Sequence, residues 1–562
     1  MPKDETAYSD QDERRWAALQ GRQVVGVGRD PGEAYRAAKT RRPKEEPTAL
    51  VPAGAGADDV DQWPQRLERL FAENPWAART RELLCSRLAG VYLVGGCVRD
   101  LMLGRPIHDL DIVMSDDAVQ WGRRLADQLG AGFYVLDAER GFARVVLLRE
   151  NHPRLFLDLS RIEGERIEED LARRDFTINA LALELCAGRL IDPFDGKGDV
   201  RRRILRPVTP QAIANDPIRA VRAVRLAVEL GFSMDASLLE AIRRDAGGLA
   251  EESPERIQQE LHRMLALPNS AEALRRMSGL GLWQYTIPEL DGLAGVSQSA
   301  PHQLDVWDHT LLTVARLEEL LRAIGLPAED GGRLVPEEWA FLEPSRPALR
   351  RHLEQELAEE RPCWQALKWA ALLHDIAKPA ARRVDEVGRV HFLGHARKGA
   401  EMAEGIMRRL RFSQREISYV CACVAHHLRP LLLSRERELT PRAQYRFFRD
   451  LGDAALGVCL LSLADTAACR PGRPPAEVWA PVQRVVQALL EFFSRTGGPE
   501  GMPRLVTGND LIQRFGLAPG PAIGKWLERV REEQAAGTFT TRDEALRWLE
   551  QAISGKEGGK SL

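Results

Sequence analysis

Hydrophobic and polar residues change their spacing along the chain, and the change predicts two kinds of structure. Between residues 91 and 200, short apolar runs alternate with polar turns and with one amphipathic stretch. From residue 215 onward, apolar residues recur every three or four positions, which is typical of helices with one buried face. We therefore expect an α+β domain followed by helical domains. The strands expected in the first region are residues 91–94, 133–136, 143–148 and 155–159, and its helix is 118–129.

The first 55 residues form a separate small α/β unit by the same criterion. Residues 10–19 and 31–41 have helical spacing, and Pro31 suits the first turn of the second helix. Residues 22–28 and 48–52 are strand candidates. An Ala-Gly-rich linker at 53–58 and two helices at 62–73 and 75–89 then lead into the α+β domain.

Two glycines, Gly95 and Gly96, directly follow the first strand of that domain. Glycine lets the backbone approach an anion closely, and a helix beginning there directs its free N–H groups at the anion. Arg99 adds a rigid fork of donors for the same anion. The stretch indicates a phosphate-binding turn, although a purely structural turn would have the same two glycines.

A pair of carboxylates, Asp109 and Asp111, begins a second apolar run. Alternate side chains of a strand share a face, so both carboxylates point the same way. Like charges at this spacing favour a cation between them, and oxygen ligands suit Mg²⁺. Asp158, inside the run LFLDLS, is a candidate third carboxylate. A solvated acidic strand edge is the alternative for each of the three.

Taken together, GGCVRD and DLDIV resemble the nucleotidyltransferase head of class II tRNA nucleotidyltransferases (CCA-adding enzymes) and bacterial poly(A) polymerases. The resemblance implies a polymerase-β-like head, a small mixed sheet with helices, followed by mostly all-α neck, body, HD and tail domains. It also implies that Asp109 and Asp111 hold two Mg²⁺ ions and that Gly95, Gly96 and Arg99 contact a nucleoside triphosphate.

The string EEDLARRDFTINALAL, residues 168–183, is similar to the ribose and triphosphate motif of that family. A plain amphipathic helix explains its apolar periodicity, but it does not explain Arg-Arg-Asp followed by an asparagine. The resemblance implies that Arg174 holds phosphate, while Asp175 and Asn179 bind the ribose hydroxyl groups.

The helical stretch NDPIRAVRAVRLAVELGF is similar to the family's base-selecting motif. Asp216 only accepts hydrogen bonds and Arg219 only donates them, which suits the exocyclic amine and ring acceptors of cytosine or adenine. Uracil and guanine present an N–H where Arg219 would donate, so a template of protein side chains admits CTP and ATP. The resemblance places Arg222 and Arg225 towards the triphosphate. Asn215 stands where the family usually has glutamate.

Histidine is concentrated in residues 300–470, which hold eight of the eleven histidines. A lone histidine on an apolar helix is usually a core residue, but His-Asp with a histidine before it and an aspartate after it is typical of a metal site. The pattern resembles the HD phosphohydrolase domain. The resemblance implies a divalent metal held by His309, His374, Asp375 and Asp465, with His395 and His426 at a second site or at a phosphate.

Composition adds limits on compartment and partners. A net charge of −3 does not by itself indicate a nucleic-acid-binding protein, although a protein with this net charge can still carry a local basic patch. Eight cysteines without a CxxC pair fit buried thiols in a reducing cytosol better than disulfides. The charged first residues indicate no signal peptide, and no uncharged apolar run reaches about 18 residues. We expect a cytoplasmic protein that does not enter the membrane.

The expected enzyme is a template-independent tRNA nucleotidyltransferase that adds CMP and AMP from CTP and ATP to the 3′ end of tRNA. The short segment between Arg149 and Glu169 also keeps a CC-adding enzyme open, and the same head serves poly(A) polymerases. An HD phosphohydrolase with an RNA-binding head is the alternative from another class. The expected domains are 1–55 (extension), 60–205 (head), 206–298 (neck and body), 299–495 (HD) and 500–555 (helical tail).

Overall fold

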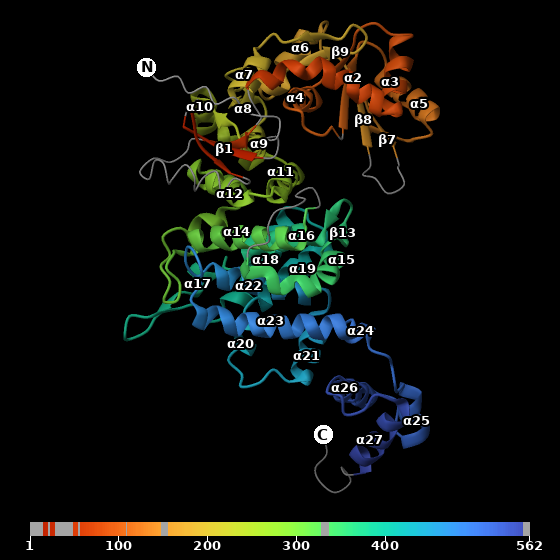
Figure 1. Ribbon diagram of the computed structural model, residues 1–562, viewed down its shortest axis with the longest axis vertical. Coiled ribbons are helices and arrows are strands. Elements are labelled where there is room, and N and C mark those ends of the chain that lie inside the picture. Colours follow the sequence, from red (N-terminus) through yellow and green to blue (C-terminus); the bar gives the residue numbers. More distant parts are fainter. Residues whose placement is uncertain are drawn as a thin grey trace. The chain divides into compact units, whose positions relative to one another are not determined.

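The computed structural model describes residues 15–20, 23–28, 49–53, 57–107, 109–147, 155–327 and 337–554. Its internal contacts divide the chain into two units, Met1–Glu252 and Ser253–Leu562. The first unit contains the β-sheets of the head and of the N-terminal extension, and the second is largely helical (Figure 1). The α+β architecture expected from the spacing of apolar residues is therefore confirmed.

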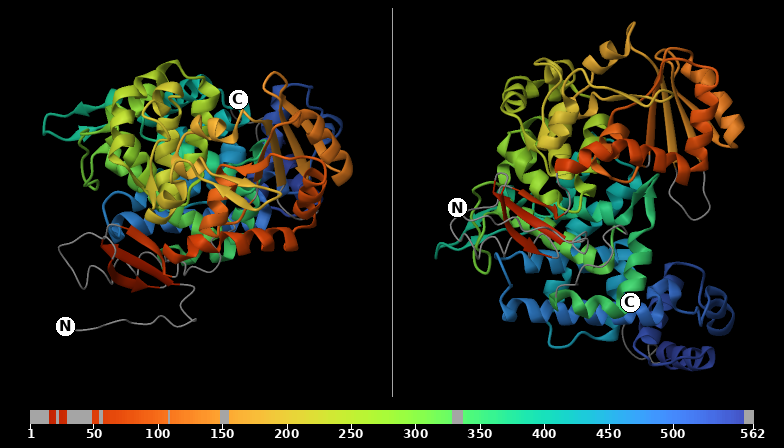
Figure 2. Two further views of the ribbon diagram at one scale, coloured as in Figure 1. Left: turned by 90° about the horizontal axis from the view of Figure 1, so that it is seen from above. Right: turned by 45° about the horizontal axis from the view of Figure 1, so that its top comes forward.

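A mixed seven-stranded sheet forms the centre of the head, in the order β10-β9-β4-β5-β8-β7-β6. The β5 and β8 strands are parallel, and the other neighbours are antiparallel. Figure 2 shows this sheet in orange and yellow with helices packed beside it. Every strand expected in this region is present. The strands are β4 (Val91–Val94), β5 (Asp109–Met114), β6 (Gly132–Asp137), β7 (Phe142–Leu147), β8 (Leu155–Arg161), β9 (Ala182–Glu184) and β10 (Arg189–Ile191).

Local sequence signals fix the ends of the helices that cover this sheet. The α5 helix is capped by the Asp117 side chain, which accepts from the Gln120 N–H, and it ends at Gly130 in the left-handed conformation. It packs on β7 and β8. The first-unit helices are α2 (Trp63–Glu73), α3 (Pro75–Cys85), α4 (Gly96–Leu103), α5 (Ala118–Leu129), α6 (Ile167–Ala172), α7 (Gly196–Arg202), α8 (Ala212–Asn215), α9 (Arg219–Leu230) and α10 (Ala236–Asp245).

The N-terminal extension contains a three-stranded antiparallel sheet of β1 (Arg15–Gln20), β2 (Gln23–Gly28) and β3 (Ala49–Ala53), in the order β2-β1-β3. The strands expected at 22–28 and 48–52 are confirmed. The helix expected at 10–19 is wrong over residues 15–19, which belong to β1 and pair with both other strands. The helix expected at 31–41 lies outside the described residues.

The second unit is a set of helices around an apolar core. The α22 helix is buried along nearly all of its length, and α14, α19 and α23 pack against it. The α19 helix begins with a capping box between Ser413 and Glu416. The longer helices are α11 (Pro254–Ala266), α12 (Ser270–Gly279), α14 (Val306–Ile324), α15 (Arg346–Leu353), α16 (Cys363–Leu373), α18 (His395–Arg409), α19 (Gln414–His426), α21 (Pro441–Leu451), α22 (Ala455–Ala467) and α23 (Ala476–Thr496).

Three helices close the chain and share a small core of their own: α25 (Gly508–Phe515), α26 (Pro521–Ala535) and α27 (Arg542–Ser554). Ion pairs join α26 to α21, including Arg446 with Glu532 at 2.6 Å and Arg449 with Glu528 at 2.7 Å. None of the described helices is long and apolar enough to cross a membrane.

One covalent bond corrects the expectation that all cysteines are thiols. Cys85 at the end of α3 forms a disulfide with Cys186 just after β9, across a sequence separation of 101 residues. The other six cysteines are free. No short spacing connects the two partners, so the sequence alone gave no sign of the pairing.

Candidate functional site

The Gly95 turn brings a cation and a carboxylate to the same place in the head. Gly95 has φ +75°, so an L residue would be strained there. A Cβ at Gly95 would lie 2.8 Å from Nη1 of Arg174 and 3.5 Å from Oδ2 of Asp111. Gly96 begins α4 immediately afterwards. The structure thus gathers the glycine turn, one aspartate of the pair and the arginine of the 168–183 string.

The three carboxylates singled out in the sequence come from two adjacent parallel strands. Asp111 on β5 lies in register with Asp158 on β8, and Asp109 is two residues earlier on β5. Asp158 accepts two hydrogen bonds from Arg144 on β7, at 2.7 and 2.8 Å. Asp109 is exposed and Asp111 is half-buried. The third carboxylate is therefore close to the other two, but its charge is compensated by an arginine.

Burial, together with neighbouring negative charge, raises the pKa of the Asp111 carboxyl to about 6. Burial contributes most, followed by the charge of Asp158, while Arg174 opposes the shift and Asp109 adds to it. A cation placed between Asp109 and Asp111 would relieve this repulsion. Two carboxylates at such an edge are hard oxygen ligands, so the residues present fit a divalent ion such as Mg²⁺.

The string 168–183 is not one helix. The α6 helix ends at Ala172, a 3₁₀ turn follows at Thr177–Asn179, and β9 begins at Ala182. The break places a chain of polar contacts beside the glycine turn. Arg99 donates to Asn179 Oδ1 at 2.7 Å, and Asn179 donates to Asp175 Oδ1 at 3.0 Å. At the far end of the chain, Arg222 of α9 donates to Asp175 Oδ2 at 3.2 Å.

Asp175 keeps its charge although it is buried. Burial acts to raise the pKa of this carboxyl, but Arg222, Asn179 and the Phe176 N–H hold it below its ordinary value. Arg99 is also bound to Asp100 at 2.9 Å and is itself buried. The hydrogen bonds among Arg99, Asn179, Asp175 and Arg222 fix the orientation of these side chains, as a rigid ligand-binding surface requires.

The expected base-selecting pair is also adjacent in space. Asp216 Oδ2 lies 3.4 Å from Nε of Arg219, at the start of α9. Arg219 donates to the backbone carbonyls of Arg173, at 2.7 Å, and of Arg174, at 3.3 Å. This arginine therefore connects α9 to the segment that carries the phosphate and ribose candidates. Arg225, two turns later, pairs with Glu229 at 2.7 Å.

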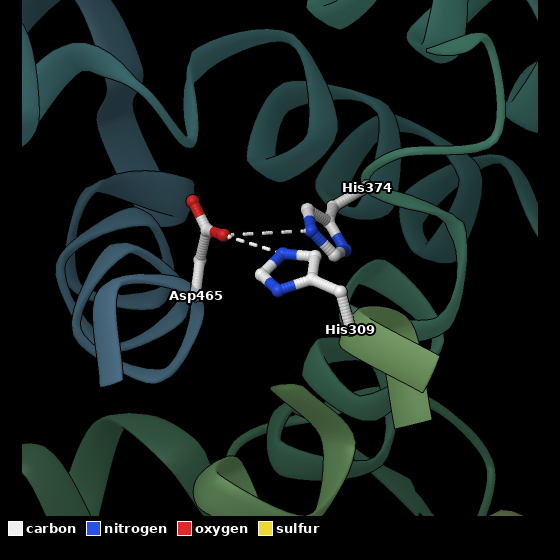
Figure 3. A group of neighbouring side chains, drawn as sticks. All are labelled: His309, His374 and Asp465. Atoms are coloured by element: carbon white, nitrogen blue, oxygen red, sulfur yellow. Dashed lines mark hydrogen bonds and ion pairs between the residues drawn. The ribbon is translucent and has the colours of Figure 1, made fainter. Parts of the chain in front are cut away.

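A second constellation lies in the second unit, where α14, α16 and α22 meet. His309, His374 and Asp465 converge from these three helices (Figure 3). Asp465 Oδ1 lies 2.9 Å from Nε2 of His309 and 3.7 Å from Nε2 of His374. Burial acts to lower the pKa of His374, but Asp375 and Asp465 raise it to about 10.

Three further residues form a second group beside the first: Asp375, His395 and His427, all buried. Here the structure corrects the sequence-based choice of His426. His426 is exposed at the end of α19, whereas its neighbour His427 is 1% exposed and faces the cluster. His302 and Lys378 also lie at the cluster and were missed, because neither belongs to the His, His-Asp, Asp pattern.

Several buried polar atoms of this cluster have no hydrogen-bond partner among the described residues. They are Nε2 of His374, Nε2 of His395 and both carboxylate oxygens of Asp375, of which Oδ2 forms an ion pair with Lys378 at 2.5 Å. Leaving such atoms unsatisfied is costly unless an ion or water binds them. Imidazole nitrogens with carboxylate oxygens are a typical donor set for divalent metals, so the residues present fit a metal ion.

Three models of protein families match successive parts of the chain. Residues 91–206 match a model of the "Poly A polymerase head domain", 231–293 one of a "Probable RNA and SrmB- binding site of polymerase A", and 306–455 one of the "HD domain". The CC-adding tRNA nucleotidyltransferase of Thermus thermophilus is 34% identical over 479 residues, which are 84% of this chain and 95% of that protein.

The chain belongs to the tRNA nucleotidyltransferase family. The A-adding tRNA nucleotidyltransferase of Deinococcus radiodurans is 32% identical, over 82% of this chain and 96% of that protein. Among solved structures, a complex of a CCA-adding enzyme with CTP matches with a TM-score of 0.54 at 20% identity, covering 87% of this chain and 98% of that one. This likeness confirms the fold expected of a tRNA nucleotidyltransferase.

Proposed function

We propose that this tRNA nucleotidyltransferase adds CMP, AMP or both, from CTP and ATP, to the 3′ end of tRNA without a nucleic-acid template. Relatives that cover most of the chain are named as CC-adding and A-adding enzymes. The single observation that carries the proposal is the meeting of Gly95, Arg174 and Asp111 at the end of β4. A turn open to phosphate, a guanidinium and an acidic pair at one point are the parts that nucleotidyl transfer needs.

In this proposal, each residue of the head has a distinct task. Asp109 and Asp111 hold two Mg²⁺ ions, which when bound supply positive charge at the reacting phosphate. Arg174 contacts the triphosphate next to Gly95 and Gly96, where no side chain obstructs it. Asp175 and Asn179 bind the ribose, and Arg99 and Arg222 fix these two side chains by the hydrogen bonds described above. The residues Arg222 and Arg225 add positive potential along α9.

Base selection is assigned to Asp216 and Arg219. A carboxylate accepts from the exocyclic amine of cytosine or adenine, and a guanidinium donates to the ring acceptors of both. Uracil and guanine would place N–H against N–H, which is repulsive. The bonds from Arg219 to the carbonyls of Arg173 and Arg174 hold its guanidinium in one orientation, as such discrimination requires.

Incorporation assays distinguish the products. The full-length protein is incubated with each labelled nucleoside triphosphate and tRNA ending either at the discriminator base or after two cytidines. Incorporation of CMP into the tRNA that ends at the discriminator base indicates a CC-adding enzyme, and incorporation of AMP into the tRNA that ends after two cytidines indicates an A-adding enzyme. Both incorporations together indicate a CCA-adding enzyme. Long A tails indicate a poly(A) polymerase. We expect Asp109→Ala and Asp111→Ala to lower incorporation at least about 100-fold while tRNA binding persists. No incorporation by the wild type on either tRNA would overturn the proposal.

The segment between Arg149 and Glu169, whose shortness keeps a CC-adding enzyme open, does not decide among these products. Residues 149–154 of it lie outside the described residues. The assay on the two tRNA ends decides the question directly.

A second activity is proposed for the cluster of histidines and aspartates: metal-dependent hydrolysis of a phosphoester. The observation in its favour is the buried group of His309, His374 and Asp465 from three helices. Phosphate release from 2′,3′-cyclic nucleotides and monoesters is measured with and without added divalent metal. We expect His309→Ala to abolish that release and to leave nucleotide incorporation unchanged. Equal release by the variant would rule the assignment out.

A further inference from the structure

The seven-stranded sheet of the head has one face covered by α5 and one face that is partly exposed. Gly122 of α5 lies on the covered face, because a Cβ there would lie 3.2 Å from Cβ of Ala143 and 3.7 Å from Cδ1 of Leu159. Both of these residues are fully buried. Side chains alternate along a strand, so their neighbours Arg144 and Asp158 project from the opposite face, where both are half-buried.

The partly exposed face is the one that carries the carboxylates of the head. Asp158 of β8 is in register with Asp111 of β5 on one side and with Arg144 of β7 on the other. Arg144 is in register with Tyr134 of β6, which forms the edge of the sheet. Side chains in register project from the same face, so a row of four runs from the acidic pair to the edge. Three steps between strands of about 4.7–4.9 Å each make this row about 14 Å long.

Arg144 presents a flat, fixed guanidinium group in the middle of the row. Its Nε and Nη2 donate to the two oxygens of Asp158, at 2.7 and 2.8 Å. Its Cζ lies 4.8 Å from the centre of the Phe156 ring, which is on the same face of β8. The side chain is nevertheless 36% exposed. The guanidinium is thus held along one edge and supported by an aromatic ring, as in a platform on which a planar group can stack.

Tyr134 places an aromatic ring beside this guanidinium. The residue is 60% exposed, although an aromatic ring gains much free energy from burial. The ring leans over Gly132, since a Cβ at Gly132 would lie 3.7 Å from its Cε2. Cross-strand neighbours have Cβ atoms about 4.5–5.5 Å apart, so Tyr134 and Arg144 form two adjacent planar surfaces, which we call the stacking pair.

We propose that the stacking pair binds the unpaired nucleotides at the 3′ end of tRNA. The inference rests on the proposed nucleotidyl transfer, in which the 3′ hydroxyl lies at Asp109 and Asp111. On one side of these carboxylates, towards β4, Gly95 and Arg174 form the site assigned to the triphosphate. The strand that ends in the 3′ hydroxyl therefore leaves on the other side, across β8, β7 and β6.

The chemistry of the pair suits single-stranded RNA whose sequence is not fixed. Unpaired bases stack on aromatic rings and on arginine guanidinium planes. Stacking accepts every base, because each base has a π face. A surface of this kind holds the discriminator base whatever its identity, and it holds the cytidines that follow. Hydrogen bonds to base edges would instead restrict the enzyme to some tRNAs.

Binding of two forms of tRNA to the full-length protein tests the proposal in the absence of nucleoside triphosphate. One form ends after two cytidines, and the other is trimmed to the last base pair of the acceptor stem. We expect Tyr134→Ala to raise the Kd of the first form at least about fivefold, as for the loss of one base–aromatic stack, and to leave the Kd of the trimmed form unchanged. Tyr134→Phe keeps the ring and should bind both forms as the wild type does.

Val135 provides the matched control. It is the next residue of β6, is 43% exposed and projects from the face that α5 covers. Val135→Ala should therefore change neither Kd. An unchanged Kd in Tyr134→Ala, or an equal change for both forms of tRNA, would overturn the proposal.

The edge strand β6 offers its backbone to another occupant, a second copy of the chain. Light scattering on the same samples tests this alternative. A wild-type dimer that dissociates in Tyr134→Ala would assign the surface to that contact and overturn the proposal. Incorporation assays separate the inference from the proposed function, since Tyr134→Ala should raise the KM for tRNA and not the KM for the nucleoside triphosphate. A wild type that binds the two forms differently but incorporates nothing would contradict the proposed function alone.

Discussion

Gly95 is the residue on which the head site depends most directly, because two independent constraints require glycine there. Its φ of +75° strains any L residue, and a Cβ would lie 2.8 Å from Nη1 of Arg174. Gly130, at the end of α5, provides a matched comparison. It has φ +63°, but nothing lies within 4 Å of the position of its Cβ.

We expect Gly95→Ala and Gly130→Ala to lose similar stability, about 1–2 kcal/mol each, since both force a side chain into the left-handed region. Only Gly95→Ala should also displace the Arg174 guanidinium. Its KM for the nucleoside triphosphate should therefore rise roughly tenfold or more, as expected for loss of a charge-assisted hydrogen bond. Chemical unfolding and steady-state incorporation measure the two effects. An unchanged KM in Gly95→Ala would show that Arg174 does not contact the triphosphate.

Among single residues, those of the site could be predicted where residues suited to one chemical task lie close together in the sequence. The glycine pair and Asp109-Leu110-Asp111 could be found because strand geometry alone places both carboxylates on one face. The choice between His426 and His427 could not be made in the same way. Adjacent residues of a helix differ by about 100° in direction, and α19 ends at His426, so only the three-dimensional packing selects His427.

At the scale of elements, periodicity predicted the strands of the head well and failed where pairing with distant segments decides the conformation. Residues 10–19 have helical spacing, yet residues 15–20 form the central strand of the N-terminal sheet. In the string 168–183, the break after Ala172 follows from contacts made elsewhere. The N–H of Thr177 bonds the carbonyl of Arg206, and β9 pairs with β4. Such long-range hydrogen bonds leave no periodic signal in the sequence.

The disulfide between Cys85 and Cys186 is another long-range contact between secondary-structure elements that the periodicity of the sequence does not show. It joins the end of α3 to the end of β9, next to the strand that leads into Gly95. Cross-links that close long loops restrict the unfolded chain, typically stabilising a protein by about 2–4 kcal/mol.

We expect a thiol reductant to lower the midpoint of thermal unfolding of the first unit, and Cys85→Ser/Cys186→Ser to reproduce that decrease. The double variant should no longer respond to the reductant, because its remaining cysteines are unpaired. Intact mass under non-reducing conditions confirms the bond beforehand. If the midpoint of thermal unfolding does not change with the reductant, the disulfide contributes nothing to stability.

At the scale of the whole molecule, two units with different stabilising chemistry make up one chain. The unit Met1–Glu252 contains the disulfide and the proposed polymerase site. The unit Ser253–Leu562 contains the histidine cluster and a network of buried polar groups. In that network, Trp369 of α16 donates to Nδ1 of His262 on α11 at 3.4 Å, and Gln365 bonds the other ring nitrogen.

Since Nδ1 of His262 accepts from Trp369, protonation of this ring would place donor against donor. Burial, with the charge of Arg361 second, lowers the pKa of His262 to about 4. The unfolded chain takes up a proton near pH 6.5, and the folded protein does so only near pH 4. Stability associated with the neutral ring is therefore complete above pH 6.5 and is lost progressively as the pH falls towards 4.

Calorimetry of the whole chain at pH 7 and pH 5 tests this for the second unit alone. We expect two unfolding transitions. The transition whose midpoint does not change with reductant belongs to the unit Ser253–Leu562, and its midpoint should shift to lower temperature at pH 5. The loss attributable to His262 is at most about 2 kcal/mol, from 1.36 kcal/mol for each pH unit below about 6.5. His262→Gln keeps a polar side chain at this position but does not titrate, so its second transition should shift less between the two pH values. Equal shifts in the variant and the wild type would mean that the pKa of His262 is not lowered in the folded protein.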